Sequence, residues 1–596
     1  MWLVSLLSDN GILRKSRGLV TFVDGADGVK SGAVVQTTAQ AMFSRAAQLV
    51  NGVSHIGGKM ASFEPNFWRL DGSFMLPVGA SHSQMEIGFV SLQMSDVEGI
   101  FSSVPEIVIS FPTARNLPLV AVVFDHAAGE AAGSLRFRAF DGANNVILDE
   151  VVQNVDRANV LHSTRGANGV RRVVISVLTT INPLRRARIA EVHFGRVLQY
   201  DGEDIVQVNS VAQADPACRA FPQNRLRVKI FNKGRFGVLG DEGDARHLRQ
   251  RQTVEYAQMT ADGAGERWMH LGNFALDSWE IRENMVELLA YGRSSGLGNE
   301  IYRDSAFEMF TLGQMARDVA RAAGFEVIVP RCMDVSPFIP RFFGNVSHRA
   351  ALIMIAELAS CMLYEDRRGV LRFVDILDEA SALTDRLDYE KLFVPPKIEM
   401  GAFYNGVILT ETWMTIEQGQ ASRADIDVSG SANVMIPFDR PIFSGGHAEV
   451  SVGFSLINPR FHAMYMTGTL TGNGRCTLEI HGMRAAFAGS ETFYRAPWFA
   501  ASQGEHPYVV KLPVFLHNMT HLSEVREWFL RRKFGMMSKR IGIDADWRQN
   551  PALDVGDGVL VQVDRAGRMV DGAVVRQEVD FDSGVLRGKT GVLAGG

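Results

Sequence analysis

The sequence lacks an excess of basic residues. It contains 61 Lys and Arg against 66 Asp and Glu, a formal net charge of −5 at pH 7. A protein that holds nucleic acid neutralises phosphates with a basic surface, so sustained DNA binding is disfavoured. Hydrophobic residues make up 46% of the chain and charged residues 21%, which is typical of folded rather than disordered proteins.

Long apolar runs are also missing. The run from Met1 to Leu7 meets Asp9 and has no basic flank, so it is too short for a signal-peptide core or a membrane span. Elsewhere the longest run, Leu117 to Phe124, has the length of a strand and contains Pro118. We therefore expect no membrane-spanning segment.

Cysteine is scarce and widely spaced. The chain has 4 cysteines, without a CxxC pair, so neither a metal motif nor a disulfide scaffold is predicted. Buried free thiols are the favoured interpretation. A cluster assembled by folding stays open as the alternative. The four residues are Cys218, Cys332, Cys361 and Cys476.

Motifs for catalysis are incomplete. Gly588-Lys589-Thr590 lacks the glycine of a phosphate loop, because Ser583 stands at that position. Carboxylate pairs such as Glu578 and Asp580 have no convergent partners and are interpreted as solvated strand edges. The sequence therefore predicts no enzyme, no catalytic residues, no cofactor and no metal site.

Glycine is plentiful, and it points to short strands joined by tight turns. The 57 glycines outnumber the 20 prolines without a collagen period. Short alternating runs between about 62 and 195 predict a single β-sandwich. Strands continue over 196–302, and we expect them to pair with a strand near residue 20. The sandwich would then be an insertion between two parts of one barrel.

Helix signals are concentrated in one α/β stretch. Thr311 and Gln314 have the spacing of a capping box, which predicts a helix over 312–323. A second helix is predicted over 348–360 and a third near 523–534.

Several segments, taken together, resemble tail proteins of long-tailed bacteriophages. Ser62 to Phe74 and Arg186 to Gly195 resemble the first and last strands of the galactose-binding-like (discoidin-type) sandwich inserted in such proteins. The stretch from about 425 to 504 matches no pattern of this family. The segments that resemble the baseplate hub, or tail-tip hub, are Arg225–Phe236, Leu271–Glu280, Thr311–Gly324, Asn550–Val563 and Arg576–Val592.

The resemblance implies a mainly β, multidomain fold, with β-barrel tube-type hub domains, an inserted β-sandwich and a small α/β domain. The implied domains are a first hub barrel from 1–55 plus 196–302, the galactose-binding-like sandwich at 56–195, the small α/β domain at 303–384, a second hub barrel from 385–475 plus 535–596, and a loop-rich elaboration with one helix at 476–534.

The function implied is that of a structural virion protein at the tail tip. A homotrimeric hub would continue or close the tail tube for DNA passage and dock the tail tube or distal tail protein, other tail-tip proteins and fibres. Few basic residues in the lumen would let DNA pass without sequence-specific binding. The alternative is a secreted or cell-surface carbohydrate-binding protein in which the sandwich is the working part.

The sandwich offers two sets of candidate residues for a host surface glycan. Trp68, Arg69 and Asp71 could place an aromatic platform and polar partners against a sugar. Trp68 lies among phenylalanines in the sequence, however, which is also typical of core packing. The second set lies in the loops that contain Asp125, His126, Asn144 and Asn145.

Overall fold

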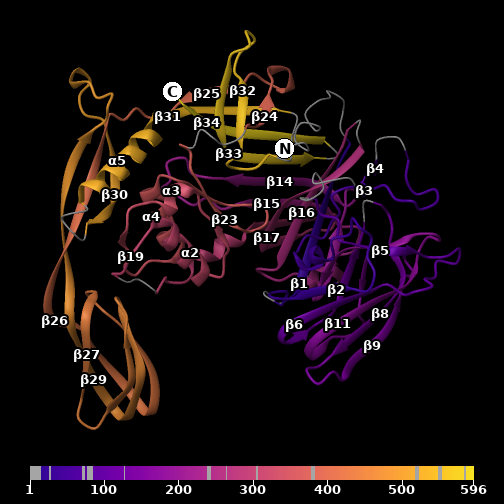
Figure 1. The fold of residues 1–596 in the computed structure, drawn as a ribbon, viewed down its shortest axis with the longest axis horizontal. Helices are drawn as coiled ribbons and strands as arrows, with labels where there is room; N and C mark the ends of the chain where they lie inside the picture. Colours follow the sequence, from indigo (N-terminus) through magenta and orange to yellow (C-terminus); the bar gives the residue numbers. More distant parts are fainter. Residues whose placement is uncertain are drawn as a thin grey trace.

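Strands dominate the computed structural model, and the prediction of a mainly β, multidomain chain is confirmed (Figure 1). None of the described helices is long and apolar enough to cross a membrane. The structure describes residues 15–25, 29–69, 74–76, 85–125, 128–237, 243–262, 265–303, 307–377, 383–516, 522–547, 553–582 and 585–595.

One 13-stranded sheet joins two β modules. The first module contains, in sheet order, β13 (Gly195–Tyr200), β1 (Lys15–Gly25), β16 (Thr253–Asp262), β17 (Gly265–Ile281), β18 (Met285–Gly292), β15 (Arg225–Phe231) and β14 (Ile205–Gln213). The second contains β33 (Met569–Asp582), β34 (Val585–Gly595), β31 (Lys539–Trp547) and β25 (Lys397–Met400), with β32 (Gly558–Gln562) and β24 (Leu383–Leu387) beside β33. Antiparallel pairing of β14 with β33 connects the modules.

The strand near residue 20 pairs as predicted. In β1, Val20 lies opposite Tyr200 of β13 and Tyr256 of β16. Val20 and Phe22 alternate into a core that also contains Tyr200 and Tyr256, all with 1% exposure or less. The chain therefore leaves the first module after β1 and returns to it at β13, because burial of this face needs both strands.

The inserted segment is a sandwich of two sheets around one hydrophobic core. One sheet has the order β10 (Val160–His162), β7 (Ala121–Phe124), β12 (Arg186–His193), β5 (Phe89–Met94). The other has the order β2 (Val34–Thr37), β6 (Glu106–Leu117), β11 (Ala167–Thr180), β8 (Ala132–Phe140), β9 (Val146–Gln153).

The sandwich begins earlier in the chain than the sequence suggested. Strand β2 pairs with β6, and the 3₁₀ helix η1 (Ala46–Val50) buries Ala46 and Leu49 in the sandwich core. Both elements fall within 1–55, which the sequence assigned to the first barrel. The β2 strand is only four residues long, so its alternation gave too little signal to place it.

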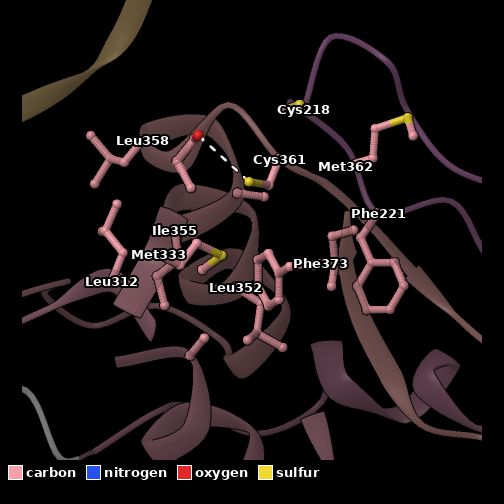
Figure 2. Packing of buried hydrophobic residues seen from close by; sticks show 14 of the residues in the cluster. Cys218, Phe221, Leu312, Met333, Leu352, Ile355, Leu358, Cys361, Met362 and Phe373 are labelled. Carbon is pink, nitrogen blue, oxygen red and sulfur yellow. Dashed lines mark hydrogen bonds between the residues drawn. The ribbon is translucent and has the colours of Figure 1, made fainter. Parts of the chain in front are cut away.

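The α/β unit packs against the first module. Its helices are α2 (Leu312–Ala322), α3 (Arg331–Asp334) and α4 (His348–Ala359), and its strands are β19 (Met309–Phe310), β20 (Val327–Ile328), β21 (Ile339–Pro340), β22 (Met362–Glu365) and β23 (Leu371–Val374). The predicted capping box at Thr311 and Gln314 is confirmed. Figure 2 shows Leu352 and Ile355 of α4 packed near Phe373 of β23 and Phe221, which follows β14.

A long arm forms a separate five-stranded sheet (Figure 1, orange). It contains β26 (Gly406–Pro437), β27 (Ile442–Val450), β28 (Ser455–Phe461), β29 (Tyr465–Arg495) and β30 (Pro507–Leu516), and α5 (Leu522–Ser538) follows it. Most of 385–475 therefore lies outside the second β module, and 476–495 is strand rather than loop. Glycine, serine and threonine fill much of these exposed strands, so the apolar alternation that marks a strand is missing.

The four cysteines are free. Cys332 and Cys361 lie with their sulfur atoms 3.8 Å apart, and Cys218 belongs to the same core as Cys361. Cys476 lies in a separate core inside the arm, so the four thiols do not form one cluster. The remaining short elements are β3 (Lys59–Met60), β4 (Phe74–Met75), η3 (Gly243–His247), η4 (Arg293–Gly298), η5 (Tyr389–Lys391) and η6 (Ala501–Gln503).

The carboxyl end of α4 gives a test of the fold. Ser360 adopts a left-handed conformation with φ of 51°, and its buried hydroxyl has no hydrogen-bond partner within the part of the chain that the structure describes. Glycine tolerates this conformation and removes the unpaired hydroxyl. We expect Ser360→Gly to stabilise the protein by about 1 kcal/mol in urea unfolding, whereas the β-branched Ser360→Val should destabilise it by about 1–2 kcal/mol. Destabilisation by glycine would contradict this reading of the helix end.

Candidate functional site

A largely apolar groove lies beside the inserted sandwich. Its volume is about 850 Å³, which falls in the usual range for small-ligand sites. Much of its lining is exposed, with Met42 at 103%, Phe63 at 93% and Leu76 at 61%. The groove is lined by Ala41, Met42, Phe43, Ser44, Arg45, Met60, Ala61, Ser62, Phe63, Trp68, Leu76, Ile87, Leu92 and Arg186.

Trp68 is half-buried in the wall of this groove. The segment around it, 62–69, forms turns rather than the strand that the sequence resembled. Its neighbour Phe63 points to solvent instead of joining a core. Trp68 therefore presents part of its ring to the groove, as an aromatic platform for a ligand requires.

A buried ion pair holds the Trp68 segment in place. The carboxylate of Glu64 accepts hydrogen bonds from the guanidinium of Arg188, which lies on β12. Both side chains are buried, with exposures of 0% for Glu64 and 4% for Arg188. The backbone N–H of Arg186 donates to Glu64 Oε1 at 2.6 Å. Arg188 also lies 4.2 Å from the ring centre of Phe67, so the turn is fixed by charge and by stacking.

These contacts govern the ionisation of Glu64. Burial by itself would raise the pKa of this carboxyl group, but the hydrogen bonds and charge of Arg188 outweigh burial and lower the pKa below its ordinary value of 4.5. Glu64 is therefore ionised near neutral pH, and the pair stays charged.

The groove also contains polar groups. The guanidinium of Arg186 lines it and donates to the carbonyl of Ser91 at 2.8 Å. Burial lowers the pKa of Arg186. Arg45, Ser44 and Ser62 line the same groove. The two guanidinium groups beside Trp68 can donate hydrogen bonds to hydroxyl oxygens of a ligand, whereas the hydroxyls of Ser44 and Ser62 already donate within the protein.

The two sets of candidate glycan residues do not converge. Asp125 is buried and accepts the N–H of Ala128 at 3.0 Å, in the turn that precedes β8. Asn144 and Asn145 lie in the turn that follows β8. That strand has nine residues and spans roughly 30 Å, so Asp125 is far from the two asparagines.

Both turns use their polar side chains internally. Asn145 donates through its side-chain amide to Asp141 at 2.9 Å, and the carbonyl oxygen of Asn144 accepts from Arg172. Asp125 is nearer to the groove, because Arg185 donates both to Glu130, in the same turn, and to the carbonyl of Pro65. The bonds of the asparagines reduce what they can offer to a sugar.

Of the remaining predicted residues, the structure describes Arg69 but not Asp71 or His126. Arg69 is exposed and does not line the groove. Asp71 and His126 lie outside the described residues. Sequence reasoning missed Arg45, Phe63 and Arg186 as parts of a site. Arg186 belonged to a segment singled out as a strand, but nothing in its spacing from Trp68 could show that both meet one groove.

Two buried groups of side chains with metal-ligating atoms also occur among the described residues. Cys332, Cys361 and Asp375 form one. Arg532 donates to Asp375 at 2.6 Å and lies 3.6 Å from the sulfur of Cys361. The guanidinium group therefore already neutralises the carboxylate of this group. The other consists of His55, Glu255 and His270.

Comparisons with known proteins give structural similarities only. No protein-family model matches the chain, and no curated protein matches it.

Solved structures of two kinds resemble parts of the chain. A tail protein from Neisseria meningitidis matches at 10% identity and a TM-score of 0.38, over 66% of this chain and 93% of that one. A 43 kDa prophage tail protein from Shewanella oneidensis matches at 10% identity and a TM-score of 0.35, over 67% and 95%. A family 32 carbohydrate-binding module from C. perfringens, solved with galactose, matches at 9% identity and a TM-score of 0.18, over 30% and 99%. Scores this low do not establish a family for this chain.

The Glu64–Arg188 pair provides a test of how the groove is built. Glu64→Gln leaves the buried Arg188 charge without its partner, and we expect a loss of about 3–5 kcal/mol in the free energy of unfolding. The double variant Glu64→Gln with Arg188→Met should recover much of this loss, since the charge is removed as well.

A surface ion pair supplies the control. Asp149→Asn breaks the exposed Arg136–Asp149 bridge, whose side chains are 43% and 39% exposed, and should cost about 0–1 kcal/mol. Because the pKa of Glu64 is lowered, its stabilisation is complete above pH 4.5 and is lost as the pH falls through the folded-state pKa. Equal losses for Glu64→Gln and Asp149→Asn would show that the buried pair does not hold the turn.

Proposed function

We propose that the chain is a structural protein of a bacteriophage tail tip, a homotrimeric hub that continues or closes the tail tube and carries a glycan-binding sandwich. Its sequence segments resemble that family in order along the chain, and its two β modules joined in one sheet support the proposal. The domains are then the two modules, the sandwich inserted in the first, the α/β unit and the arm.

The observation that carries the proposal is an uncovered edge of the second module. Strand β25 pairs with β31 on one side, and all four of its residues are exposed. Ile398 lies opposite the buried Ile543, on the core face of the sheet, yet it is 49% exposed. Met400, two residues on, is 60% exposed. An open edge with apolar side chains is a surface that a native protein covers with a partner.

The opposite end of the sheet is already covered. The N–H of Val197 in β13 donates to the ring Nε2 of His162 at 3.0 Å, and His162 belongs to β10 of the sandwich. The sandwich thus lies against β13. In our proposal a second copy of the chain covers β25, and repetition around a threefold axis closes the ring.

The oligomeric state tests this proposal. We expect the full chain to form trimers, seen as threefold rings by electron microscopy and as a threefold mass by light scattering. Ile398→Lys with Met400→Lys should give monomers, because charges replace the apolar edge.

Val585→Lys is the matched control for the edge variant. Val585 has the same 49% exposure as Ile398 but lies at the end of β34, away from β25. This variant should remain trimeric. A wild-type chain that stays monomeric at micromolar concentration would refute the proposal.

The tube would conduct DNA without retaining it. The net charge of −5 offers no general attraction to phosphates. The surfaces that face the axis carry few basic residues in this proposal, so DNA slides through without sequence-specific binding. Docking to the tail tube or distal tail protein, to other tail-tip proteins and to fibres belongs to the same proposal, as does a place in the virion.

The groove beside the sandwich is the proposed site for a host surface glycan. A half-buried Trp68 with Arg45 and Arg186 nearby combines an apolar platform with hydrogen-bond donors. This combination suits a sugar ring, whose faces are apolar and whose edges are hydroxylated. Arg69, Asp125, Asn144 and Asn145 stay candidates of lower rank, since none of them lines the groove. Asp71 and His126 stay candidates that lie outside the described residues.

Glycan binding is tested on an array and then by titration with the best-bound glycan. Trp68→Ala removes the platform and should weaken binding roughly tenfold or more. Trp498→Ala is the control, because Trp498 is 37% exposed in the segment after β29 and outside the groove. Unchanged affinity in Trp68→Ala would exclude the groove as the glycan site, while the trimer test stays independent of it.

A further inference from the structure

A buried cluster of His55, Glu255 and His270 lies where the sandwich joins the first module. Glu255 is on β16 and His270 on the adjacent β17. His55 comes from the stretch that follows η1 within the inserted segment. Glu255 and His55 are each 2% exposed, and the side chain of His270 is 11% exposed. The three residues thus come from two parts of the chain that are about 200 positions apart.

The distances suit ligands of one metal ion. His55 Nδ1 lies 3.0 Å from Glu255 Oε1, and His270 Nδ1 lies 3.4 Å from the same oxygen. Two ligands of a tetrahedral zinc ion, with bonds of about 2.0–2.1 Å, are separated by about 3.3 Å. One ligand atom from each of the three residues lies within 4.8 Å of the others.

The ring of His270 is oriented as a metal ligand. Its Nε2 is 3.0 Å from the backbone carbonyl of Arg367, which can only accept, so Nε2 carries the proton. Its Nδ1 lies 3.4 Å from Glu255 Oε1 and is buried, with no hydrogen-bond partner among the described residues. A cation shared by this nitrogen and the carboxylate oxygen, either a metal ion or a proton on Nδ1, would satisfy both atoms.

A backbone contact also orients the carboxylate of Glu255. The backbone N–H of Ser54 donates to both carboxylate oxygens, at 2.9 and 2.8 Å. Hydrogen bonds that orient a carboxylate and a carbonyl that fixes a histidine tautomer are the usual surroundings of metal ligands.

A small cavity with a mixed polar and apolar lining reaches Glu255. Its volume is about 230 Å³, and Glu255 lines it. Water in this cavity can supply a fourth ligand. Lys30, Arg293 and Arg368 also line it. Lys30 is paired with Glu191, and Arg368 lies 3.7 Å from Glu86, so part of this positive charge is neutralised.

We propose that His55, Glu255 and His270 bind a zinc-type divalent ion that clamps the inserted sandwich to the first module. The ion is structural: it ties the part of the insertion that follows η1 to β16 and β17, and through Arg367 to the turn between β22 and β23. This proposal is independent of the tail-tip function, because it concerns only how the insertion is anchored.

Metal content of the full chain tests the clamp. The protein is loaded with zinc or cobalt(II), freed of excess metal and analysed for metal per chain. We expect one ion per chain and a lower melting temperature after chelation. His270→Gln should weaken metal binding at least roughly tenfold. His481→Gln, in an exposed Glu449–Glu479–His481 group of the arm, is the control and should bind as the wild type does.

The wild-type protein also decides the question if a variant fails to fold. Cobalt(II) held by nitrogen and oxygen ligands lacks the sulfur-to-metal charge-transfer absorption that thiolates give. That absorption, or loss of the ion in Cys332→Ser, would assign the metal to Cys332, Cys361 and Asp375 and overturn the proposal. A wild-type chain without bound metal after loading would overturn it equally, and would identify the cluster as a carboxylate paired with protonated histidines.

Discussion

Antiparallel pairing of β14 with β33 is the interaction on which the architecture depends. It joins residues 207–213 to 576–582, more than 360 positions later, and makes one sheet from two modules. Val579 and Phe581 of β33 are buried in the core of the first module. The second module therefore supplies part of the first module's core. The first module is therefore incomplete without β33, and hydrogen bonds and burial together fix the relative orientation of the two modules.

The inserted sandwich must also be held in a fixed position against the first module, and buried carboxylates provide the contacts that do this. Residues 52–64 follow η1 of the sandwich and contact both the sandwich and the first module. The N–H of Gly52 donates to Glu191, the N–H of Ser54 donates to Glu255, and Glu64 pairs with Arg188. Each contact joins this segment to a strand that is far away in the sequence. Buried carboxylates that have such partners favour one arrangement, because another arrangement would leave these groups unpaired in a dry site.

Local signals in the sequence were sufficient to predict the helices at 312–323, 348–360 and near 523–534, and many of the strands. The capping box at Thr311 needs only four consecutive residues, and β1 shows clear alternation, so both could be predicted. The arm could not. Its long strands carry Gly, Ser and Thr on exposed faces, and pairing over 31 residues between β26 and β29 replaces the apolar pattern that sequence reasoning relies on. Strand β2 was missed because its membership of the sandwich is decided by β6, some 70 positions later.

The same limit of sequence-based prediction applies to the residues of the candidate site. Trp68 stood out by residue type, but its environment depends on a turn that Glu64 fixes through a strand more than 120 positions away. Asn144 and Asp125 were equally plausible by type, and β8 holds them at opposite ends. The ligand-type residues His55, Glu255 and His270 have no informative spacing, because their geometry arises from β16–β17 pairing and from the entry of the insertion. The proposed sites in this chain therefore depend on contacts between distant segments, which local sequence patterns do not reveal.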